Sequence, residues 1–405
     1  MKRRVLLVAS KTGYQVREFY GAAERLGIDL VLATDRCHIL DDPWGDRASP
    51  LRFDAEAQDQ EQAIAELGSR GPFDGIVAVG DRPACIAALC AEQLGLRFHP
   101  SQAARAATDK YQTRERFRAA GMNVPRYLLV CPDEGSEPPG FPCVLKPLNL
   151  SGSRGVIRAD TPGEFSAAEA RIRRIVGPDA TLLAEEFIPG REFALEGIVT
   201  GGNLQTLAIF DKPDPLDGPF FEETIYTTPS REPQAVQCAI KEAVQQAVSA
   251  LGLSFGPVHA EMRVNPRGVW MLEAAPRPIG GLCSRVLRFQ GGRGLEDILL
   301  SHALGESVSD LDLAPGAHGV MMIPIPGRGV YHGVNGLERA SEIADLEAVE
   351  ITAKQGQLFE PLPEGASYLG FLFARAPEIH AVETALRRAY ECLHFHVSPA
   401  LPVSR

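Results

Sequence analysis

The sequence predicts an α/β protein of several domains, and three observations carry that prediction. Short apolar runs alternate with amphipathic, helix-like segments, as in parallel sheets that are covered on both faces. The chain has 405 residues, a length that corresponds to about two to four domains. It is 45% hydrophobic and 23% charged, a composition that excludes disordered, collagen-like and disulfide-scaffold proteins.

The first part of the chain predicts a parallel α/β unit, which we place at 1–105. Apolar strands and amphipathic helices alternate there, at 5–10, 15–26, 29–33, 75–79 and 82–94. The first apolar run is only about six residues long, shorter than the apolar segment of a signal peptide. We therefore expect a buried first strand at the N-terminus.

Two further regions are predicted at 106–305 and 306–405. A helix carrying Lys110 opens the second region, and a Pro- and Gly-rich link over 132–142 follows it. Strands and helices are then predicted at 144–147, 163–176, 182–188, 193–210, 234–251, 257–264 and 268–274. The third region shows strand-like and helix-like runs at 319–324, 369–375 and 377–391.

The charge balance and the cysteines limit the partners and the compartment. The formal net charge of -11 disfavours a nucleic acid or an anionic membrane, although a local basic cleft can still hold a phosphorylated ligand. No run approaches the ~20 apolar residues of a membrane span. Eight cysteines are scattered without a C-x-x-C pair, which is typical of reduced core residues. We therefore expect a cytoplasmic protein.

Two glutamates form the strongest candidate site. Glu261 and Glu273 lie on strand-like runs joined by the turn 265–268, so they can face each other across a hairpin. Facing carboxylates repel each other unless a cation lies between them, and Mg²⁺ takes carboxylate and phosphate oxygens. Glu273 also follows an apolar run, where an unpaired carboxylate is costly. The pattern favours a metal pair, with two solvated hairpin residues as the alternative.

Two lysines and a glycine-rich loop indicate a phosphate site. Lys146 ends an apolar strand, which can aim its ammonium into a cleft, and Lys110 lies just past the first region. Backbone N–H groups of a flexible loop can close over phosphates. The loop after Lys146 offers such groups at Ser151, Gly152, Ser153 and Gly155. It lacks the Gly-Lys-[Ser/Thr] of a Walker A loop, and a surface position is the alternative for each lysine.

An acidic and apolar connection follows the next strand, at Glu185, Glu186, Phe187 and Ile188. A connection between two lobes can offer backbone N–H and C=O groups to an adenine edge, while a carboxylate accepts ribose hydroxyls. Glu192 is the candidate for that carboxylate. A charged strand end is the alternative.

Other segments are candidates for substrate contacts. Glu222 or Glu223 can pair with a substrate ammonium, and His259 can contact substrate or transfer a proton. The alternatives are solvated loop carboxylates and a satisfied structural histidine. Arg285 and Arg288 form a basic pair that either holds a second carboxylate or lies on a helix surface.

In order and spacing, these segments resemble the ATP-grasp superfamily over most of the chain. Within it, the runs Pro276–Gly281 and Gly319–Pro324 are most similar to the L-amino acid ligases. The resemblance implies an ATP-grasp fold over 106–305. That fold would follow an N-terminal α/β domain and precede a C-terminal lid-like domain.

The resemblance also implies roles for the candidate residues. Lys110 and Lys146 would contact ATP phosphates, Ser151 to Gly155 would form a mobile flap, and Glu185 to Ile188 would be the adenine hinge. Glu192 would bind ribose, and Glu261 and Glu273 would bind Mg²⁺. Arg277 would face the transferred phosphoryl group and the carboxylate substrate, next to Gly280 and Gly281. The family often has Asn where this chain has Ala275, so the number of metal ions stays open.

The implied activity is that of an ATP-dependent carboxylate–amine ligase, which forms an amide bond through an acyl phosphate. Amino acids would be the carboxylate and amine substrates and a dipeptide the product, with ATP and Mg²⁺ as cofactors and a homodimer as one open assembly. A ligase of another natural-product or cofactor pathway is the first alternative. A biotin-carboxylase-like enzyme is disfavoured, because Asn-x-Arg-x-Gln-Val-Glu-His is absent after Glu273. A non-catalytic ATP-binding module is the third alternative.

Overall fold

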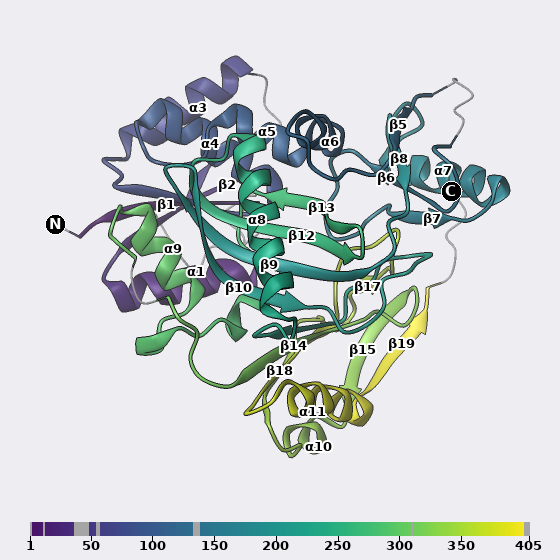
Figure 1. Ribbon diagram of the computed structural model, residues 1–405. Helices are drawn as coiled ribbons and strands as arrows, with labels where there is room; N and C mark the ends of the chain where they lie inside the picture. Colours follow the sequence, from purple (N-terminus) through teal and green to yellow (C-terminus); the bar gives the residue numbers. More distant parts are fainter. Residues whose placement is uncertain are drawn as a thin grey trace.

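The structure is a computed structural model that describes residues 2–10, 13–35, 48–53, 57–132, 138–308 and 311–400. A long antiparallel sheet runs through the middle of the molecule, between an N-terminal sheet and a four-stranded sheet (Figure 1). Part of the predicted link, residues 133–137, and Cys37 lie outside the described residues, and the described cysteines are free thiols. Within the described ranges, no helix is both long enough and apolar enough to cross a membrane.

The N-terminal sheet is parallel, with the strand order β3-β2-β1-β4. Its strands are β1 (Arg4–Ala9), β2 (Asp29–Thr34), β3 (Ala48–Pro50) and β4 (Gly75–Val79), and its helices are α1 (Tyr14–Leu26), α3 (Ala57–Ser69) and α4 (Asp81–Leu94). Side chains of β1 alternate between two cores: Val5 and Leu7 pack with α1, and Leu6 and Val8 pack with α3 and α4. This double burial explains the unbroken apolar run.

The four-stranded sheet is antiparallel, with the order β5-β8-β6-β7, and α7 packs on β6 and β7. The elements of this part are α5 (Ser101–Thr108), α6 (Lys110–Ala119), β5 (Tyr127–Val130), β6 (Cys143–Pro147), β7 (Ile157–Ala159), α7 (Pro162–Val176) and β8 (Leu182–Glu186). The single helix predicted to carry Lys110 is two helices, because Asp109 leaves the helical conformation and caps α6 through the N–H of Gln112.

The long sheet has the order β13-β12-β9-β10-β11-β14-β18-β16 and is antiparallel throughout. Its strands are β9 (Arg191–Thr200), β10 (Asn203–Asp211), β11 (Ile225–Thr228), β12 (Phe255–Asn265), β13 (Gly268–Ala275), β14 (Ala317–Ile323), β16 (Leu346–Ile351) and β18 (Gly370–Ala376). The sheet therefore continues across the division predicted at 305/306. The three-part division of the chain stays a prediction.

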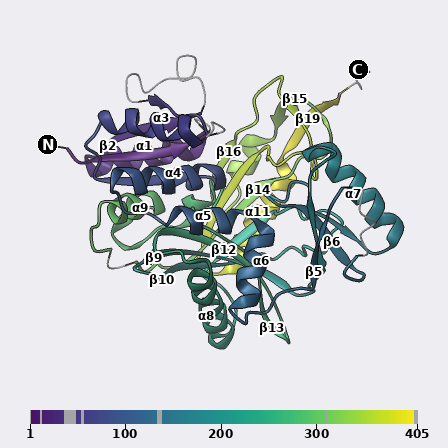
Figure 2. The same cartoon turned by 90° about the horizontal axis from the view of Figure 1, so that it is seen from above.

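Helices anchor this sheet to its surroundings. The helix α8 (Gln234–Leu251) packs on β10 and β13, and α11 (Ile379–Cys392) packs on β14 and β18. The helix α9 (Leu295–Ala303) returns to the N-terminal sheet and packs on α1 and β4. Figure 2 shows α9 beside the N-terminal elements, at a distance from α7.

Short elements complete the chain. Two short 3₁₀ helices, η2 (Cys283–Val286) and η3 (Gln290–Gly292), follow β13. A three-stranded sheet with the order β17-β15-β19 lies near the C-terminus, and α10 follows β15. The bounds are β15 (Gly329–Asn335), α10 (Leu337–Ser341), β17 (Leu358–Phe359) and β19 (His394–Pro399). The prediction missed these elements.

Candidate functional site

A cleft of about 410 Å³ lies where the N-terminal sheet, the four-stranded sheet and the long sheet meet. Such a volume is typical of small-molecule sites. The cleft brings together most of the residues that the sequence singled out, namely Lys110, Lys146, Ser151, Gly152, Ser153, Glu185, Glu186, Phe187, Ile188, Glu192, His259, Glu261, Glu273, Arg277, Gly280 and Gly281.

Two candidates lie elsewhere, which corrects their predicted placement. Gly155 is buried and its N–H donates to the carbonyl of Pro363 (2.9 Å), so it does not line the cleft. Glu222 does not line it either, and its carboxylate accepts a hydrogen bond from the backbone of Ile325. Its neighbour Glu223 lines the cleft instead.

The basic pair after the double glycine also lies outside the cleft. Arg285 forms ion pairs with Glu18 (2.7 Å) and Glu350 (3.2 Å), and Arg288 forms one with Glu347 (3.2 Å). Neither arginine lines the cleft. The structural reading of this pair therefore replaces the substrate reading.

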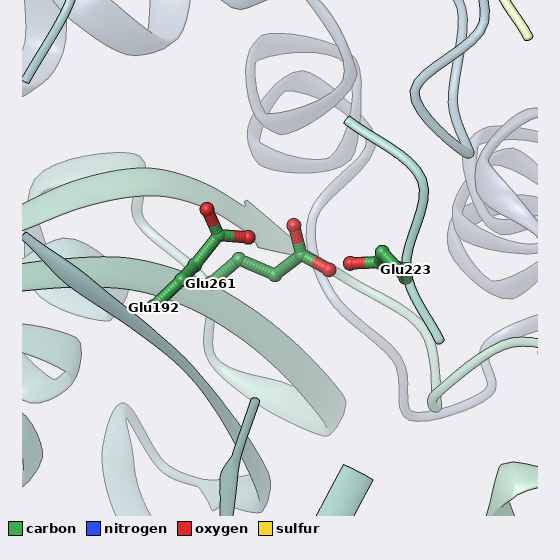
Figure 3. Close-up of side chains that lie close together, drawn as sticks. All are labelled: Glu192, Glu223 and Glu261. Atoms are coloured by element: carbon green, nitrogen blue, oxygen red, sulfur yellow. The ribbon is translucent and has the colours of Figure 1, made fainter. Parts of the chain in front are cut away.

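Three carboxylates that line the cleft meet around the buried ammonium of Lys212, and we call these four residues the Lys212 cluster. Glu192, Glu223 and Glu261 place one oxygen each within 4.8 Å of the others (Figure 3). The Nζ of Lys212 lies 2.9 Å from Glu192, 2.5 Å from Glu223 and 3.4 Å from Glu261. Burial opposes the charge of Lys212, but the three carboxylates outweigh it and hold its pKa well above the usual value.

The predicted metal pair is only partly reproduced in this cluster. Glu261 and Glu273 are direct partners in the ladder between β12 and β13. The group of close carboxylates, however, contains Glu261 and not Glu273. Burial raises the pKa of Glu273, and repulsion from Asp81 and Glu261 raises it further. Glu273 is thus a buried carboxyl whose ionised form lacks sufficient positive charge around it.

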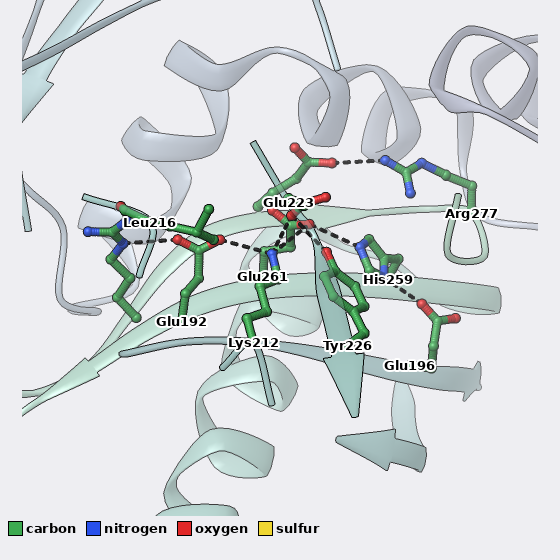
Figure 4. A network of polar contacts seen from close by, with 11 residues as sticks. Glu192, Glu196, Lys212, Leu216, Glu223, Tyr226, His259, Glu261 and Arg277 are labelled. Carbon is green, nitrogen blue, oxygen red and sulfur yellow. Dashed lines mark hydrogen bonds and ion pairs between the residues drawn. The ribbon is translucent and has the colours of Figure 1, made fainter. Parts of the chain in front are cut away.

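His259 lies between two carboxylates (Figure 4). Its Nδ1 is 2.5 Å from Glu196 Oε1, and its Nε2 is 3.3 Å from Glu261 Oε1. Burial opposes protonation of the ring, but Glu196 and Glu261 outweigh it and raise the pKa of His259 to about 9. The histidine is therefore a cation at neutral pH and a second positive neighbour of Glu261.

Lys146 shares a buried carboxylate with an arginine. Arg114 donates to the two carboxylate oxygens of Glu185, through Nε (2.9 Å) and Nη2 (3.1 Å). The Lys146 ammonium contacts the same carboxylate. Burial lowers the pKa of Lys146, and repulsion from Arg114 and Lys110 lowers it further. The attraction of Glu185 opposes these effects, and the resulting pKa is about 8. Glu185, buried yet paired with both cations, has its pKa lowered to about 2.

Arg277 is held from three sides. Its Nε donates to Asp81 (2.7 Å), its Nη1 to the carbonyl of Pro278 (3.2 Å) and its Nη2 to Glu273 (3.3 Å). Asp81 opens α4, so the N-terminal sheet contributes a carboxylate to this cleft. A guanidinium with five donors suits this arrangement. The contacts fix its plane.

The glycine-rich loop is attached to the C-terminal part of the chain. Besides the bond from Gly155 to Pro363, Arg154 Nε donates to the carbonyl of Glu364 (2.9 Å). The side chain of Glu364 accepts two bonds from Arg171 of α7 (2.6 and 2.9 Å). The segment 363–364 therefore forms hydrogen bonds with both the glycine-rich loop and α7. Just beyond it, Ala366 to Tyr368 line the cleft.

The connection after β8 has one unused backbone donor. The N–H groups of Glu186 and Phe187 donate to the carbonyls of Arg126 and Pro142 (2.8 and 3.0 Å). Within the described residues, the N–H of Ile188 donates to no carbonyl. Apolar side chains surround this point in the cleft, from Val144, Val156, Phe187 and Leu272.

Sequence reasoning assigned no role to several residues that line the cleft. Asp81, Tyr14, Met322 and Tyr368 line it and lie in separate segments of the chain. Lys212 was also missed: it pairs with three lining glutamates without lining the cleft itself, and it follows Asp211 rather than an apolar run.

Family comparisons agree with this geometry. An ATP-grasp domain matches residues 139–286, an ATP-grasp N-terminal domain matches 20–97, and an L-amino acid ligase C-terminal domain matches 321–398. The crystal structure of L-amino acid ligase from Bacillus licheniformis superposes with a TM-score of 0.84 at 26% identity, covering 98% of this chain and all of the other.

Two curated relatives extend the likeness. The protein y4rH of Sinorhizobium fredii is 22% identical over 98% of this chain and 84% of its own length. The ATP-grasp enzyme fsqD of Aspergillus fumigatus is 25% identical over 73% of this chain, which spans 58% of that relative.

The fold and the cleft define an ATP-dependent ligase of the ATP-grasp superfamily, which confirms the predicted fold and enzyme class. Within that superfamily the chain belongs to the L-amino acid ligase family. It is a carboxylate–amine ligase of that type, as the sequence predicted. Its superfamily binds ATP with Mg²⁺, and its family implies amino acid substrates.

Proposed function

We propose that this ligase activates the carboxylate of an amino acid as an acyl phosphate and joins it to the amine of a second amino acid. The observation that carries the proposal is the convergence in one cleft of Lys110, Lys146, Arg277 and the paired glutamates Glu261 and Glu273. A cleft with this arrangement can hold a triphosphate and a carboxylate side by side. Bringing those two anions together requires several fixed cations.

The ATP-binding end is formed by the four-stranded sheet and the loop that follows β6. The N–H of Ile188, which donates to no carbonyl of the described residues, supports an adenine hinge at Glu185 to Ile188. Glu192, which lines the cleft, would accept a ribose hydroxyl. Lys110, Lys146 and the loop residues Ser151 to Ser153 face the phosphates. A neutral Lys146 at high pH would lose that attraction.

The donor set fits Mg²⁺. Glu261 and Glu273 offer carboxylate oxygens, the ligand type that Mg²⁺ takes together with phosphate oxygens. Burial and repulsion from Asp81 and Glu261 raise the pKa of Glu273, so its ionised form is disfavoured. A bound cation would stabilise that ionised form. The ion would neutralise charge on the phosphates. Ala275 offers no side-chain ligand, so water or phosphate would complete the shell.

The chemistry follows from charge and from leaving groups. A carboxylate oxygen attacks the γ-phosphorus of ATP, the bond to the β-phosphate oxygen breaks, and ADP and an acyl phosphate result. The amine nitrogen then attacks the acyl carbon and phosphate leaves, while the nitrogen loses a proton. Arg277 would hold the carboxylate and the equatorial oxygens, because its plane is fixed by Asp81 and Glu273.

The test is phosphate release from ATP and Mg²⁺ over all pairs of amino acids, with mass spectrometry of the products. A peptide product together with equimolar ADP and phosphate is the expected result. Amide products with other amines only would favour a ligase of another pathway. No release with any carboxylate would overturn the enzyme and favour an ATP-binding module.

A variant pair tests the metal assignment in the same assay. Glu273→Gln should abolish phosphate release while the protein stays folded by circular dichroism. Glu242→Gln changes an exposed glutamate of α8 and serves as the matched control. Unchanged turnover in Glu273→Gln would remove this residue from the metal site.

A further inference from the structure

One end of the cleft is lined by side chains that ATP chemistry does not need, and we call it the aromatic end. It is formed by Tyr14 of α1, Cys283 of η2, Met322 of β14 and Tyr368, over the buried ring of Phe371. Cys283, Met322 and Phe371 belong to one hydrophobic core, and the two tyrosines pack on its edge while remaining half-buried. Four separate elements therefore converge on one apolar pocket.

The rings have defined positions around Phe371. Its centroid lies 5.6 Å from that of Tyr14 in an edge-on contact and 6.2 Å from that of Tyr368. Met322 is the ladder partner of Phe371. Gly281 closes the pocket from the other side, at a positive φ of 66°, and a Cβ there would come within 2.9 Å of the Phe371 ring. The backbone of Gly281, with no side chain, thus forms this wall.

The aromatic end adjoins the reacting groups on two sides. The loop that carries Arg277 continues directly into Gly280 and Gly281, and Gln15 beside Tyr14 donates to the carbonyl of Ile279 (2.9 Å) in that loop. On the opposite side lies the Lys212 cluster. Burial raises the pKa of the Cys283 thiol and of the Tyr368 hydroxyl, and in both the charge of Glu223 raises it further. A carboxylate held at Arg277, beside Gly280 and Gly281, would therefore direct its side chain into this end.

Among the described residues, the two carboxylates nearest to the aromatic end already have hydrogen-bond partners. Glu223 already accepts bonds from Lys212 (2.5 Å) and Tyr226 (2.7 Å). Glu222, the other carboxylate whose field reaches Tyr368, accepts a bond from the backbone of Ile325. A charged side chain entering here would lose its hydration without gaining a partner. An apolar side chain would gain contact with aromatic and sulfur-bearing groups on every side.

We infer that the activated carboxylate belongs to an amino acid with a bulky, uncharged and apolar side chain, which packs in the aromatic end. The inference rests on the proposed function and adds the class of substrate to it. Leucine, methionine and phenylalanine are the representatives. Alanine leaves the pocket unfilled, and aspartate and lysine bring an unpaired charge.

Hydroxylamine separates the choice of carboxylate from the choice of amine. With ATP, Mg²⁺ and hydroxylamine as the only added nucleophile, each amino acid that forms an acyl phosphate yields a hydroxamate, which an iron complex or mass spectrometry detects. We expect kcat/KM for leucine, methionine and phenylalanine to exceed that for alanine, aspartate and lysine by at least about tenfold. Hydroxamates mainly from small or charged amino acids would overturn the inference and leave the ligase function standing. No ATP-dependent hydroxamate from any carboxylate would overturn both.

A variant pair locates the effect. Tyr368→Ala should raise KM for phenylalanine by about tenfold, because one wall of the pocket is lost, while KM for ATP stays the same. Tyr390→Ala removes a half-buried tyrosine of α11 that does not line the cleft, and it should leave both constants unchanged. Equal effects of the two variants on phenylalanine would assign the loss to general destabilisation and contradict the pocket. A loss confined to ATP would contradict it as well.

Discussion

The two ends of the cleft are built by opposite rules. At the charged end, by which we mean the Lys212 cluster together with Lys146 and the paired glutamates, ion pairs dominate, and the ammonium of Lys212 lies 2.5–3.4 Å from three carboxylates. In the aromatic end, groups pack at ring distances of about 6 Å and carry no charge that needs a partner. Loss of one charge should therefore impair stability or activity at the charged end. At the aromatic end, the volume of the side chains should decide how well a substrate binds. A ligase needs both kinds of contact, because it must bind anions and must also select the side chain of its substrate.

The largest effect is expected at the centre of the charged end. Lys212→Met leaves one buried and two partly buried carboxylates without their shared ammonium and should lower the free energy of unfolding by about 3 kcal/mol. Urea denaturation at neutral pH measures the loss. The loss should shrink as the pH falls, because the carboxylates then become neutral. Lys241→Met, at an exposed site of α8, is the control, and an equal stability of the two variants would refute the role of the cluster.

Arg277 lies between the two ends, so its replacement tests how they are joined. Arg277→Lys keeps the charge but loses the planar contacts to Asp81 and Glu273, and turnover should fall by about a hundredfold. KM for ATP should change less than about twofold, because uniform binding of ATP is kept. Steady-state kinetics with Arg288→Lys as the control separates the two effects. Near-normal turnover would remove Arg277 from the chemistry.

The pH profile sharpens the contrast, because it concerns the charged end alone. Lys146, with its pKa lowered to about 8, is charged below that pH, so kcat/KM for ATP should be level there and fall about tenfold per unit above it. Folding stability has the opposite sign: between about pH 8 and 10.5 the unfolded chain holds the extra proton, so this residue contributes a rise in stability with pH. Lys146→Arg should abolish the fall in kcat/KM. A profile that is unchanged in this variant would assign the titration to another group.

The smallest effect is expected where both ends meet the C-terminal segment. Glu364→Gln weakens the contact with Arg171 of α7, which holds the segment 363–364 whose carbonyls bind the glycine-rich loop. The pair is partly exposed, so its contribution is modest. Phosphate release without amide product should rise about twofold to fivefold, because a looser loop admits water. Glu360→Gln alters the exposed pair with Arg328, and the same rise there would contradict a specific role for Glu364.

Much of the charged end was predictable from the sequence. A lysine or glutamate at the end of an apolar run is conspicuous, because burying an unpaired charge is costly. Lys146 and Glu273 were found in this way, and the ladder places Glu261 opposite Glu273 as the spacing predicted. Lys212 follows Asp211 rather than an apolar run, so this signal does not mark it. The sequence left Glu222 and Glu223 as equal candidates, because the segment before β11 has no period from which to judge the side that each residue faces.

The aromatic end shows what patterns cannot supply. Tyr14, Cys283, Met322 and Tyr368 are ordinary core-like residues in four separate elements. Nothing in their local sequence distinguishes a pocket wall from a packed interior. They become a site only because α1 and β14 approach the loop after β13 in space.

The sequence by itself determined the alternation of strands and helices, the charged motifs in their order and the family that these motifs resemble, because each depends on neighbours along the chain. The tertiary structure decided which distant residues bind one another. Lys212 pairs with three glutamates, Arg277 donates to Asp81, and Arg154 of the glycine-rich loop donates to the carbonyl of Glu364. These contacts join residues about 10 to 200 positions apart, as the closure of long loops allows at little extra cost. Which side chains meet across such distances is set by sheet register and packing, and a linear pattern does not contain that information.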